Sequence, residues 1–240
     1  MVSGPADTAW RVGSVSRISK ETPSAARIVL DVDGWPGNDA GQHLDIRLTA
    51  PDGYTATRSY SIASAGPGMV VDLAVDKLPD GEVSPFLVDD VMAGDKLEVH
   101  GPLGGWFVWR PDAASSPVQL IGGGSGVVPL IAMLRSHHDT ADATPFRLLY
   151  SLRTPEDTFF PEVLKDADVD YVYTRRAPDG WPTPAGRLTK DVLAASVFAA
   201  AEKPRVFLCG STGFVETVAA WLVELGHDPR MIRTERFGGT

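Results

Sequence analysis

The chain has 240 residues, which is enough for two domains that each bury a core. Hydrophobic residues make up 43% and charged residues 22%, a globular composition that argues against a disordered chain. The formal net charge of −9 disfavours a nucleic-acid partner, because an acidic surface repels phosphate backbones.

The first half of the sequence has the pattern of short strands. Residues 10–20 and 25–32 are rich in Val, Ile and Arg and flank a turn sequence, Thr22-Pro23-Ser24. Residues 44–48 alternate apolar with charged side chains, the period of a strand with one buried face. Many short strands separated by turns predict a small antiparallel β-barrel. Further strands are predicted at 55–63, 69–76 and 96–100, and a short helix is predicted from an N-cap at Ser84, through Pro85, to about Met92.

The second half alternates strands with helices, after a loop predicted at 111–117. Such βαβ alternation predicts a parallel sheet with helices on both faces. We therefore expect two domains, at residues 1–111 and 112–240. Strands are predicted at 118–121, 146–150, 170–173 and 206–208, helices to about His137, at 189–200 and at 212–225, and a helix-capping sequence at 154–157.

A glycine-rich loop, Gly122 to Pro129, follows the first of these strands and opens a helix. Glycines let the backbone approach a ligand closely, and a helix N-terminus offers free N–H groups and a positive dipole end. The loop therefore suits a pyrophosphate, although Pro129 stands where the usual dinucleotide fingerprint has its third glycine. A purely structural turn is the alternative interpretation.

Two segments of the first half can also hold an anion. In Arg58-Ser59-Tyr60-Ser61, a strand would place Arg58 and Tyr60 on one side, where Arg can grip a phosphate and Tyr can stack on a ring. Gly81 to Ser84 precedes the predicted short helix and forms a second cradle by the same N-terminus argument. An exposed strand and an ordinary capped helix are the alternatives.

Cys209 is the only cysteine, and it follows a late strand at the sheet edge where parallel sheets bind ligands. A single thiol excludes an internal disulfide and a cysteine-ligated zinc or iron–sulfur site, so we expect no metal. Met1 to Trp10 has no signal-peptide pattern, and no apolar run approaches the roughly 20 residues of a membrane helix. These features predict a cytoplasmic protein without a membrane partner.

Six motifs, in chain order, resemble those of the ferredoxin–NADP⁺ reductase superfamily of flavoproteins, and the resemblance covers nearly the whole chain. Each motif alone is weak, but all stand in register. The family patterns R-x-Y-[ST], G-x-x-S, G-D-x-[LV]-x-V-x-G-P, G-x-G-x-x-P, C-G and an acidic–aromatic ending match Arg58–Ser61, Gly81–Ser84, Gly94–Pro102, Gly124–Pro129, Cys209-Gly210 and Glu235–Phe237.

The resemblance implies a flavin domain followed by a nicotinamide domain, with the active site at their junction. In the family the Arg and Tyr of the first motif bind the flavin phosphate and ring, and the Ser approaches flavin N5. It thus implies those roles for Arg58, Tyr60 and Ser61. Further flavin contacts are implied for Ser59, Gly81, Val83, Ser84 and Phe237.

For the nicotinamide nucleotide, the resemblance implies that the glycine loop binds the pyrophosphate and that Cys209, with Gly210, lies beside the hydride-donating carbon. Glu235 offers a charge that favours the positive nicotinamide product. Ser61, Cys209 and Glu235 are therefore the candidate catalytic residues. Ser151 and Arg153 at one strand end, with Arg175 and Arg176 at the next, suit a 2′-phosphate and favour NADPH over NADH; ordinary surface cations are the alternative. The nucleotide candidates also include Gly123, Gly124, Ser125, Gly126, Ser151, Arg153 and Arg175.

The implied activity is that of a flavin-dependent NAD(P)H oxidoreductase, with FAD favoured and FMN as the alternative. Hydride passes from NADPH or NADH to the flavin, and electrons pass onward. Since a plant-type iron–sulfur domain needs four cysteines, we expect a separate acceptor such as a ferredoxin, a flavodoxin or an oxygenase component. A free-flavin reductase and a non-catalytic nucleotide-binding interaction module are the alternative functions.

Overall fold

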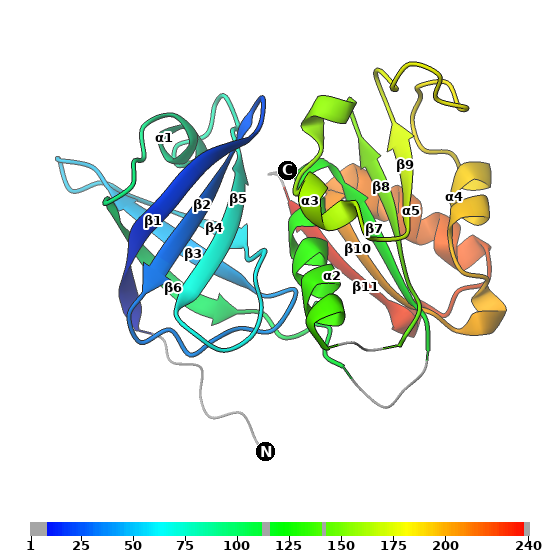
Figure 1. Cartoon of the computed structure of the whole chain (residues 1–240), viewed down its shortest axis with the longest axis horizontal. Coiled ribbons are helices and arrows are strands. Elements are labelled where there is room, and N and C mark those ends of the chain that lie inside the picture. Colours follow the sequence, from blue (N-terminus) through cyan, green and yellow to red (C-terminus); the bar gives the residue numbers. More distant parts are fainter. Residues whose placement is uncertain (1–8, 112–115, 141–142, 238–240) are drawn as a thin grey trace. The chain divides into compact units, whose positions relative to one another are not determined.

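The computed structural model describes residues 9–111, 116–140 and 143–237. It divides the chain into two compact units, Met1–Trp109 and Arg110–Thr240, each with its own sheet (Figure 1). Residues 112–115 of the predicted loop, which adjoin the predicted domain boundary, lie outside the described residues. Residues 1–8 of the segment considered for a signal peptide also lie outside them.

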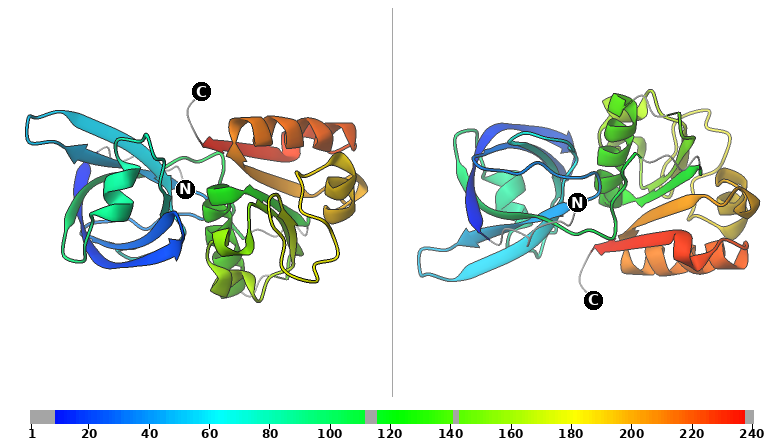
Figure 2. Two further views of the ribbon diagram at one scale, coloured as in Figure 1. Left: turned by 90° about the horizontal axis from the view of Figure 1, so that it is seen from above. Right: turned by 90° about the horizontal axis from the view of Figure 1, so that it is seen from below.

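The first unit contains an antiparallel sheet, as the sequence predicts. Its described strands run in the order β4-β3-β6-β1-β2-β5, and a bridge between Ile62 and Leu73 links the two ends of the sheet into a barrel (Figure 2). The elements are β1 (Trp10–Thr22), β2 (Ala25–Val32), β3 (His43–Thr49), β4 (Thr55–Ser61), β5 (Val70–Asp76), α1 (Ser84–Asp89) and β6 (Lys96–Leu103).

The barrel core follows from the alternation of apolar residues along these strands. Ile28, Leu30 and Val32 of β2 are fully buried, and so are Leu44 and Ile46 of β3. Each such side chain stabilises the fold by roughly 1.5–3 kcal/mol relative to its exposed state. The core thereby fixes the register of β3 against β4, the strand that carries the first motif.

The cap of α1 differs from the prediction. Val83, not Ser84, is the N-cap residue, and the helix ends at Asp89 rather than near Met92. The Ser84 hydroxyl instead accepts a hydrogen bond of 3.0 Å from the backbone N–H of Leu78. The Ser84 hydroxyl therefore accepts from the preceding loop, and it does not cap the helix as the usual preference for Ser at the N-cap predicts.

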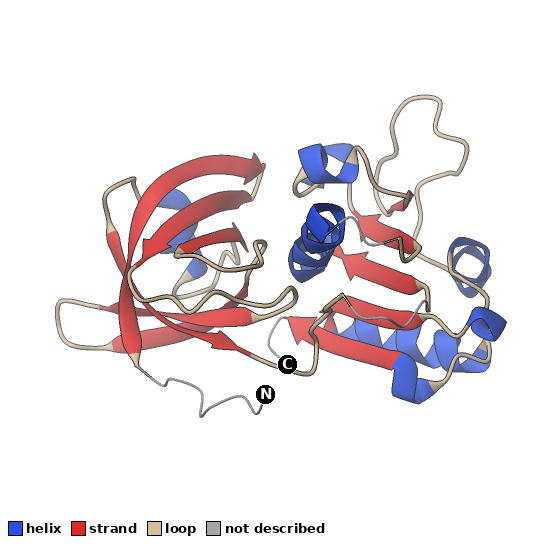
Figure 3. Cartoon of the chain, turned by 60° about the horizontal axis from the view of Figure 1, so that its bottom comes forward, coloured by secondary structure: helices blue, strands red, loops and turns tan. Residues whose placement is uncertain are grey.

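The second unit contains a parallel sheet, which confirms the α/β prediction (Figure 3). Among the described residues its strand order is β11-β10-β7-β8-β9. The strands are β7 (Val118–Gly123), β8 (Phe146–Leu152), β9 (Val169–Tyr173), β10 (Arg205–Ser211) and β11 (Ile232–Phe237).

Helices lie on both faces of this sheet, also as predicted (Figure 3). α4 and α5 cover the face that includes Ile121 and Leu208, whereas Gly122 faces Val127, just before α2, and Leu130 in α2. The helices are α2 (Val128–Thr140), α3 (Pro161–Leu164), α4 (Lys190–Ser196) and α5 (Thr212–Glu224), with short 3₁₀ turns η1 (Gly124–Val127), η2 (Pro155–Asp157), η3 (Ala200–Glu202) and η4 (Pro229–Met231). No helix among the described residues is long and apolar enough to cross a membrane.

One of the predicted helical segments differs in detail. The predicted helix at 189–200 ends at Ser196 because Val197 adopts an extended backbone, although Thr189 caps its start by accepting from the N–H of Val192. The predicted capping sequence at 154–157 is confirmed: Thr154 is the N-cap residue, Pro155 follows, and Asp157 accepts from the N–H of Thr154 at 3.0 Å, at the start of a single 3₁₀ turn.

Candidate functional site

Two of the predicted motifs of the first unit meet in space. Nη2 of Arg58, on β4, donates to Oε2 of Glu82 at 2.5 Å, and Glu82 lies inside the Gly81–Ser84 loop. The Tyr54 hydroxyl donates to Oε1 of the same carboxylate at 2.9 Å. These hydrogen bonds, from Tyr54 first and then Arg58, lower the pKa of Glu82. Neither Glu82 nor Tyr54 is among the site residues predicted from the sequence, and the only sequence signal for Glu82 is its place inside the Gly81–Ser84 motif.

Tyr60 and Ser61 end the same strand close to the barrel core. Burial raises the pKa of Tyr60 to about 12, so its phenol stays neutral, and the ring packs against the core. Ser61 is 6% exposed, and its hydroxyl has no hydrogen-bond partner among the described residues. A buried polar atom without a partner carries a free-energy cost of roughly 1–3 kcal/mol, which a polar ligand edge can offset.

The other predicted flavin contacts are placed differently. The Ser59 hydroxyl donates to Asp45 at 2.5 Å, on the strand face opposite Arg58 and Tyr60. The Val83 side chain belongs to the barrel core, which leaves only its backbone for a ligand. A Cβ on Gly81 would lie 2.9 Å from the Ser84 hydroxyl, so this loop has no room for a side chain at position 81 unless Ser84 moves.

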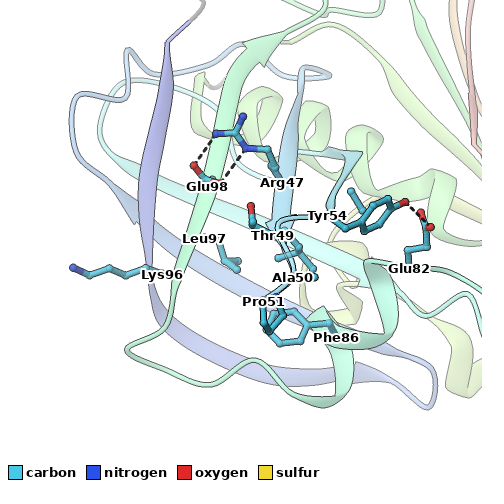
Figure 4. A pocket seen from close by; sticks show the side chains of 12 residues that line it. Arg47, Thr49, Ala50, Pro51, Tyr54, Glu82, Phe86, Lys96, Leu97 and Glu98 are labelled. Atoms are coloured by element: carbon cyan, nitrogen blue, oxygen red, sulfur yellow. Dashed lines mark hydrogen bonds and ion pairs between the residues drawn. The ribbon is translucent and has the colours of Figure 1, made fainter.

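A pocket of about 500 Å³ opens beside this loop, between the β3–β4 hairpin, α1 and β6 (Figure 4). Its floor is largely apolar, with Leu48, Ala56 and Leu97, and Tyr54 and Glu82 stand at one edge. Arg58 itself does not line this pocket. Figure 4 shows the Tyr54 hydroxyl pointing to the Glu82 carboxylate.

In the second unit, the glycine loop packs against the end of β10. A Cβ on Gly126 would lie 2.5 Å from the carbonyl oxygen of Cys209, a contact that no side chain can make. Cβ atoms on Gly123 and Gly210 would both collide with the ring of Phe214. The structure therefore brings the glycine loop together with the Cys209-Gly210 motif, as the predicted nucleotide site requires. Gly124 and Ser125, in η1, lie between these contacts, and Gly124 is exposed.

The strand register places Cys209 between two other predicted residues. Cys209 is opposite Gly122 of β7 on one side and opposite Glu235 of β11 on the other. Two positions further along the same pair of strands, Phe237 is opposite Ser211. The C-terminal acidic–aromatic motif is thus a sheet strand.

Desolvation determines the protonation states of Glu235 and Cys209. Desolvation raises the pKa of Glu235 to about 7. Burial, together with the nearby Glu235 charge, raises the pKa of the Cys209 thiol well above its usual value. The thiol is therefore neutral at physiological pH and can offer a compact, polarizable surface. A carboxyl poised near neutrality can hold or release a proton.

The predicted strand-end residues also come together. Ser151 is buried in β8, and the backbone N–H of Arg175 donates to the carbonyl of Arg153 at 3.0 Å. Both Arg side chains are exposed, and neither has an ion-pair partner within the described parts of the chain. The neighbouring Arg176, in contrast, pairs with Glu156.

Comparison with known proteins matches both units. Residues 12–108 match the oxidoreductase FAD-binding domain, and residues 120–220 match the oxidoreductase NAD-binding domain. The chain belongs to the ferredoxin–NADP⁺ reductase superfamily. It has the superfamily's two domains, and they occur in the order that the motifs indicate.

Curated proteins with related sequences cover most of this chain. The glycine betaine monooxygenase reductase subunit of Chromohalobacter salexigens is 32% identical over 211 residues, which cover 83% of this chain and 56% of that protein. The chain spans between 54% and 65% of the length of four such curated relatives.

Two solved structures share the fold. The FAD/NAD-binding domain of a Vibrio cholerae nitric oxide dioxygenase has a TM-score of 0.83 at 24% identity, covering 95% of this chain and 99% of that one. A Neisseria gonorrhoeae ferredoxin NADP⁺ reductase with bound FAD and NADP has a TM-score of 0.77 at 18% identity, covering 97% and 99%.

The residues present fit the cofactors of the superfamily. In the first unit, the unpartnered Ser61 hydroxyl and the half-exposed Arg58 suit a flavin with a phosphate. In the second, Gly123 to Gly126 lie directly before α2, and a helix N-terminus presents backbone N–H groups that suit a pyrophosphate. The described residues hold no group of three or more His, Cys, Asp or Glu that could bind a metal.

Proposed function

We propose that the chain is an FAD-dependent NAD(P)H oxidoreductase that passes electrons to a separate redox protein or oxygenase component. The observation that carries this proposal is the presence, in one chain, of an FAD-binding and an NAD-binding domain. Within each domain, residues of separate motifs lie together: Arg58 with Glu82 in the first, and Cys209 with Glu235 in the second. Residues 1–111 would form the flavin domain and residues 112–240 the nicotinamide domain. The cytoplasmic location stays a prediction.

In the flavin domain, Arg58 would bind the flavin phosphate, because a guanidinium makes charge-assisted hydrogen bonds to phosphate oxygens. Tyr60 would offer its neutral ring to the isoalloxazine face. The Ser61 hydroxyl, which has no partner among the described residues, would hydrogen-bond near flavin N5.

In the nicotinamide domain, backbone N–H groups of residues 123–126 would hold the nucleotide pyrophosphate. Cys209 would set the position of the nicotinamide ring, and the adjacent Glu235 would hold a proton or a charge beside it. Bound FAD would supply the redox chemistry, by accepting a hydride from reduced nicotinamide and releasing electrons to the acceptor.

The proposed electron acceptor is a separate redox protein or an oxygenase component. The similar protein from Chromohalobacter salexigens is named as a monooxygenase reductase subunit, which supports an oxygenase component as acceptor. The 240 residues contain one cysteine, so they cannot themselves hold a four-cysteine iron–sulfur cluster.

The test is anaerobic reduction of the purified protein. We expect the protein to keep a yellow flavin through gel filtration, and we expect NADPH or NADH to bleach it. A panel of ferredoxins, flavodoxins and oxygenase components then identifies the acceptor by its own colour change.

Each failure has a distinct meaning. Loss of the flavin on the column, with turnover only when free flavin is added, would instead identify a free-flavin reductase. Retained flavin that neither nucleotide reduces would contradict the proposal and leave a binding module.

A further inference from the structure

Glu82 lies in the loop between β5 and α1, inside the Gly81–Ser84 motif for which the family resemblance implies flavin contacts. Its two carboxylate oxygens are both engaged, one by Arg58 at 2.5 Å and the other by Tyr54 at 2.9 Å. The cation assigned to the phosphate is therefore already bound to an anion of the chain itself. Figure 4 shows the Tyr54 side of this arrangement.

The chain itself engages two of the five N–H groups of the Arg58 guanidinium. Nη1 of Arg58 donates to the carbonyl of Thr57 at 2.8 Å, and Nη2 donates to Glu82. A phosphate gains most from a guanidinium when it takes two parallel N–H groups. Both edges of a guanidinium that present such a pair include Nη2, so the phosphate would lie beside the Glu82 carboxylate, and two anions on one cation repel each other.

We infer that Glu82 is an internal competitor of the flavin phosphate: it holds Arg58 when the phosphate is absent and must release it for the phosphate to bind. The inference rests on the proposed function, because it takes Arg58 as the phosphate ligand. It assigns to Glu82 a role that sets the affinity for phosphorylated flavins.

The exchange requires no rearrangement of the core. The Arg58 and Glu82 side chains are 50% and 49% exposed, so either can turn toward solvent. Tyr54 keeps a hydrogen bond for the displaced carboxylate. Exposed ion pairs contribute little to stability, so the competition weakens flavin binding severalfold and does not abolish it.

The test uses the full chain freed of flavin, with affinities measured by the quenching of flavin fluorescence. Glu82→Gln keeps the shape of the side chain and an oxygen for Tyr54, but removes the charge. We expect roughly three- to tenfold tighter binding of FAD and FMN. Riboflavin has the same ring without a phosphate, so we expect its affinity to be unchanged.

Asp80→Asn is the matched control. Asp80 lies in the same loop and loses the same charge, but it has no ion pair among the residues that the structure describes. We expect less than about a twofold change in FAD affinity, because an exposed charge without a partner is largely screened. Circular dichroism verifies that each variant is folded.

Several outcomes would overturn the inference. These are unchanged or weaker FAD binding by Glu82→Gln, equal tightening by Asp80→Asn, or equal tightening for riboflavin. If Arg58→Ala weakens FAD binding while Glu82→Gln changes nothing, the inference fails and the proposed function stands. If the parent chain binds no FAD, both fail.

Discussion

The candidate phosphate-binding arginines of the two units differ in whether they already form an ion pair within the chain. Arg58 of the first unit is paired with Glu82, whereas Arg153 and Arg175 of the second unit have no ion pair among the described residues. An anion that binds in the first unit must therefore exchange an existing contact, while one that binds in the second adds a contact. Arginines that carry equal charge can therefore contribute unequal free energies to the binding of a phosphate.

Carboxylates of the two units also differ in protonation. Hydrogen bonds from Arg47 lower the pKa of Glu98 on the outside of the barrel, whereas burial raises the pKa of Glu235 to about 7. The first group favours the ionised state and the second favours the protonated state. The stability of the protein should thus respond to pH through these groups with opposite signs.

The largest expected effect concerns Glu235. Below about pH 4.5 it is protonated in the folded and the unfolded chain, and its contribution to stability is fully present. Between pH 4.5 and 7 the unfolded chain ionises this carboxyl while desolvation keeps it protonated in the folded chain, so about 3 kcal/mol of stability is lost over that range and stays lost above it. We expect Glu235→Gln to be more stable than the parent at pH 8, with the difference shrinking toward pH 5.

Urea unfolding at the two pH values measures this difference. Glu98→Gln is the opposite control: its partner Arg47 stabilises the ionised form, so this variant should lose stability at pH 8 and approach the parent as the pH falls. A Glu235→Gln effect of the same size at both pH values would contradict the assigned protonation.

The next effect tests whether both sites serve one reaction. Ser61→Ala in the first unit and Cys209→Ala in the second should each slow flavin reduction by about 100-fold, because small misplacements of reacting groups carry that cost. Stopped-flow reduction by NADPH measures the rates, and flavin content shows that the cofactor is still bound. Cys209→Ser should retain more activity than Cys209→Ala, since it keeps the size of the side chain. Unchanged rates in both alanine variants would remove these residues from the hydride site.

Much of the fold could be predicted because periodic patterns report burial directly. Alternation in 44–48 indicated β3, and the glycine loop after an apolar run indicated the β7–α2 connection. The strand Ile232–Phe237 has no such pattern: polar and charged residues fill most of it, and pairing with β10 alone makes it a strand. The resemblance to a family pointed to its residues where periodicity could not.

The site was less accessible to sequence reasoning. The Arg58–Glu82 pair joins residues 24 positions apart, from a strand and a loop that no period connects. The burial of Cys209 beside Glu235 likewise depends on the order of the strands in the sheet, which the sequence does not specify. Residue types therefore suggested the chemistry, and the tertiary contacts decided which groups are engaged and which are available.

A smaller effect concerns the engaged cation. Arg58→Ala should weaken FAD binding roughly 10- to 100-fold, because charge-assisted hydrogen bonds to the phosphate are lost. The simultaneous loss of the Glu82 pair places the result toward the lower end of this range. Equilibrium dialysis measures the affinity, with riboflavin as the ligand that lacks a phosphate. Parent-like FAD affinity would show that Arg58 does not bind the phosphate.

The smallest effect concerns Arg153 and Arg175, which have no ion pair among the residues that the structure describes. We expect the parent to prefer NADPH, and we expect Arg153→Ala and Arg175→Ala each to lower kcat/KM for NADPH by about tenfold while NADH is little affected, because only NADPH carries a 2′-phosphate. Arg176→Ala is the matched control, since Arg176 is the next residue but is already paired with Glu156. Its smaller effect would show that an ion pair within the chain withdraws a cation from ligand binding, the same principle that the Glu82 variants test in the other unit. A parent enzyme with the higher kcat/KM for NADH would contradict the assignment of the two free cations to a 2′-phosphate.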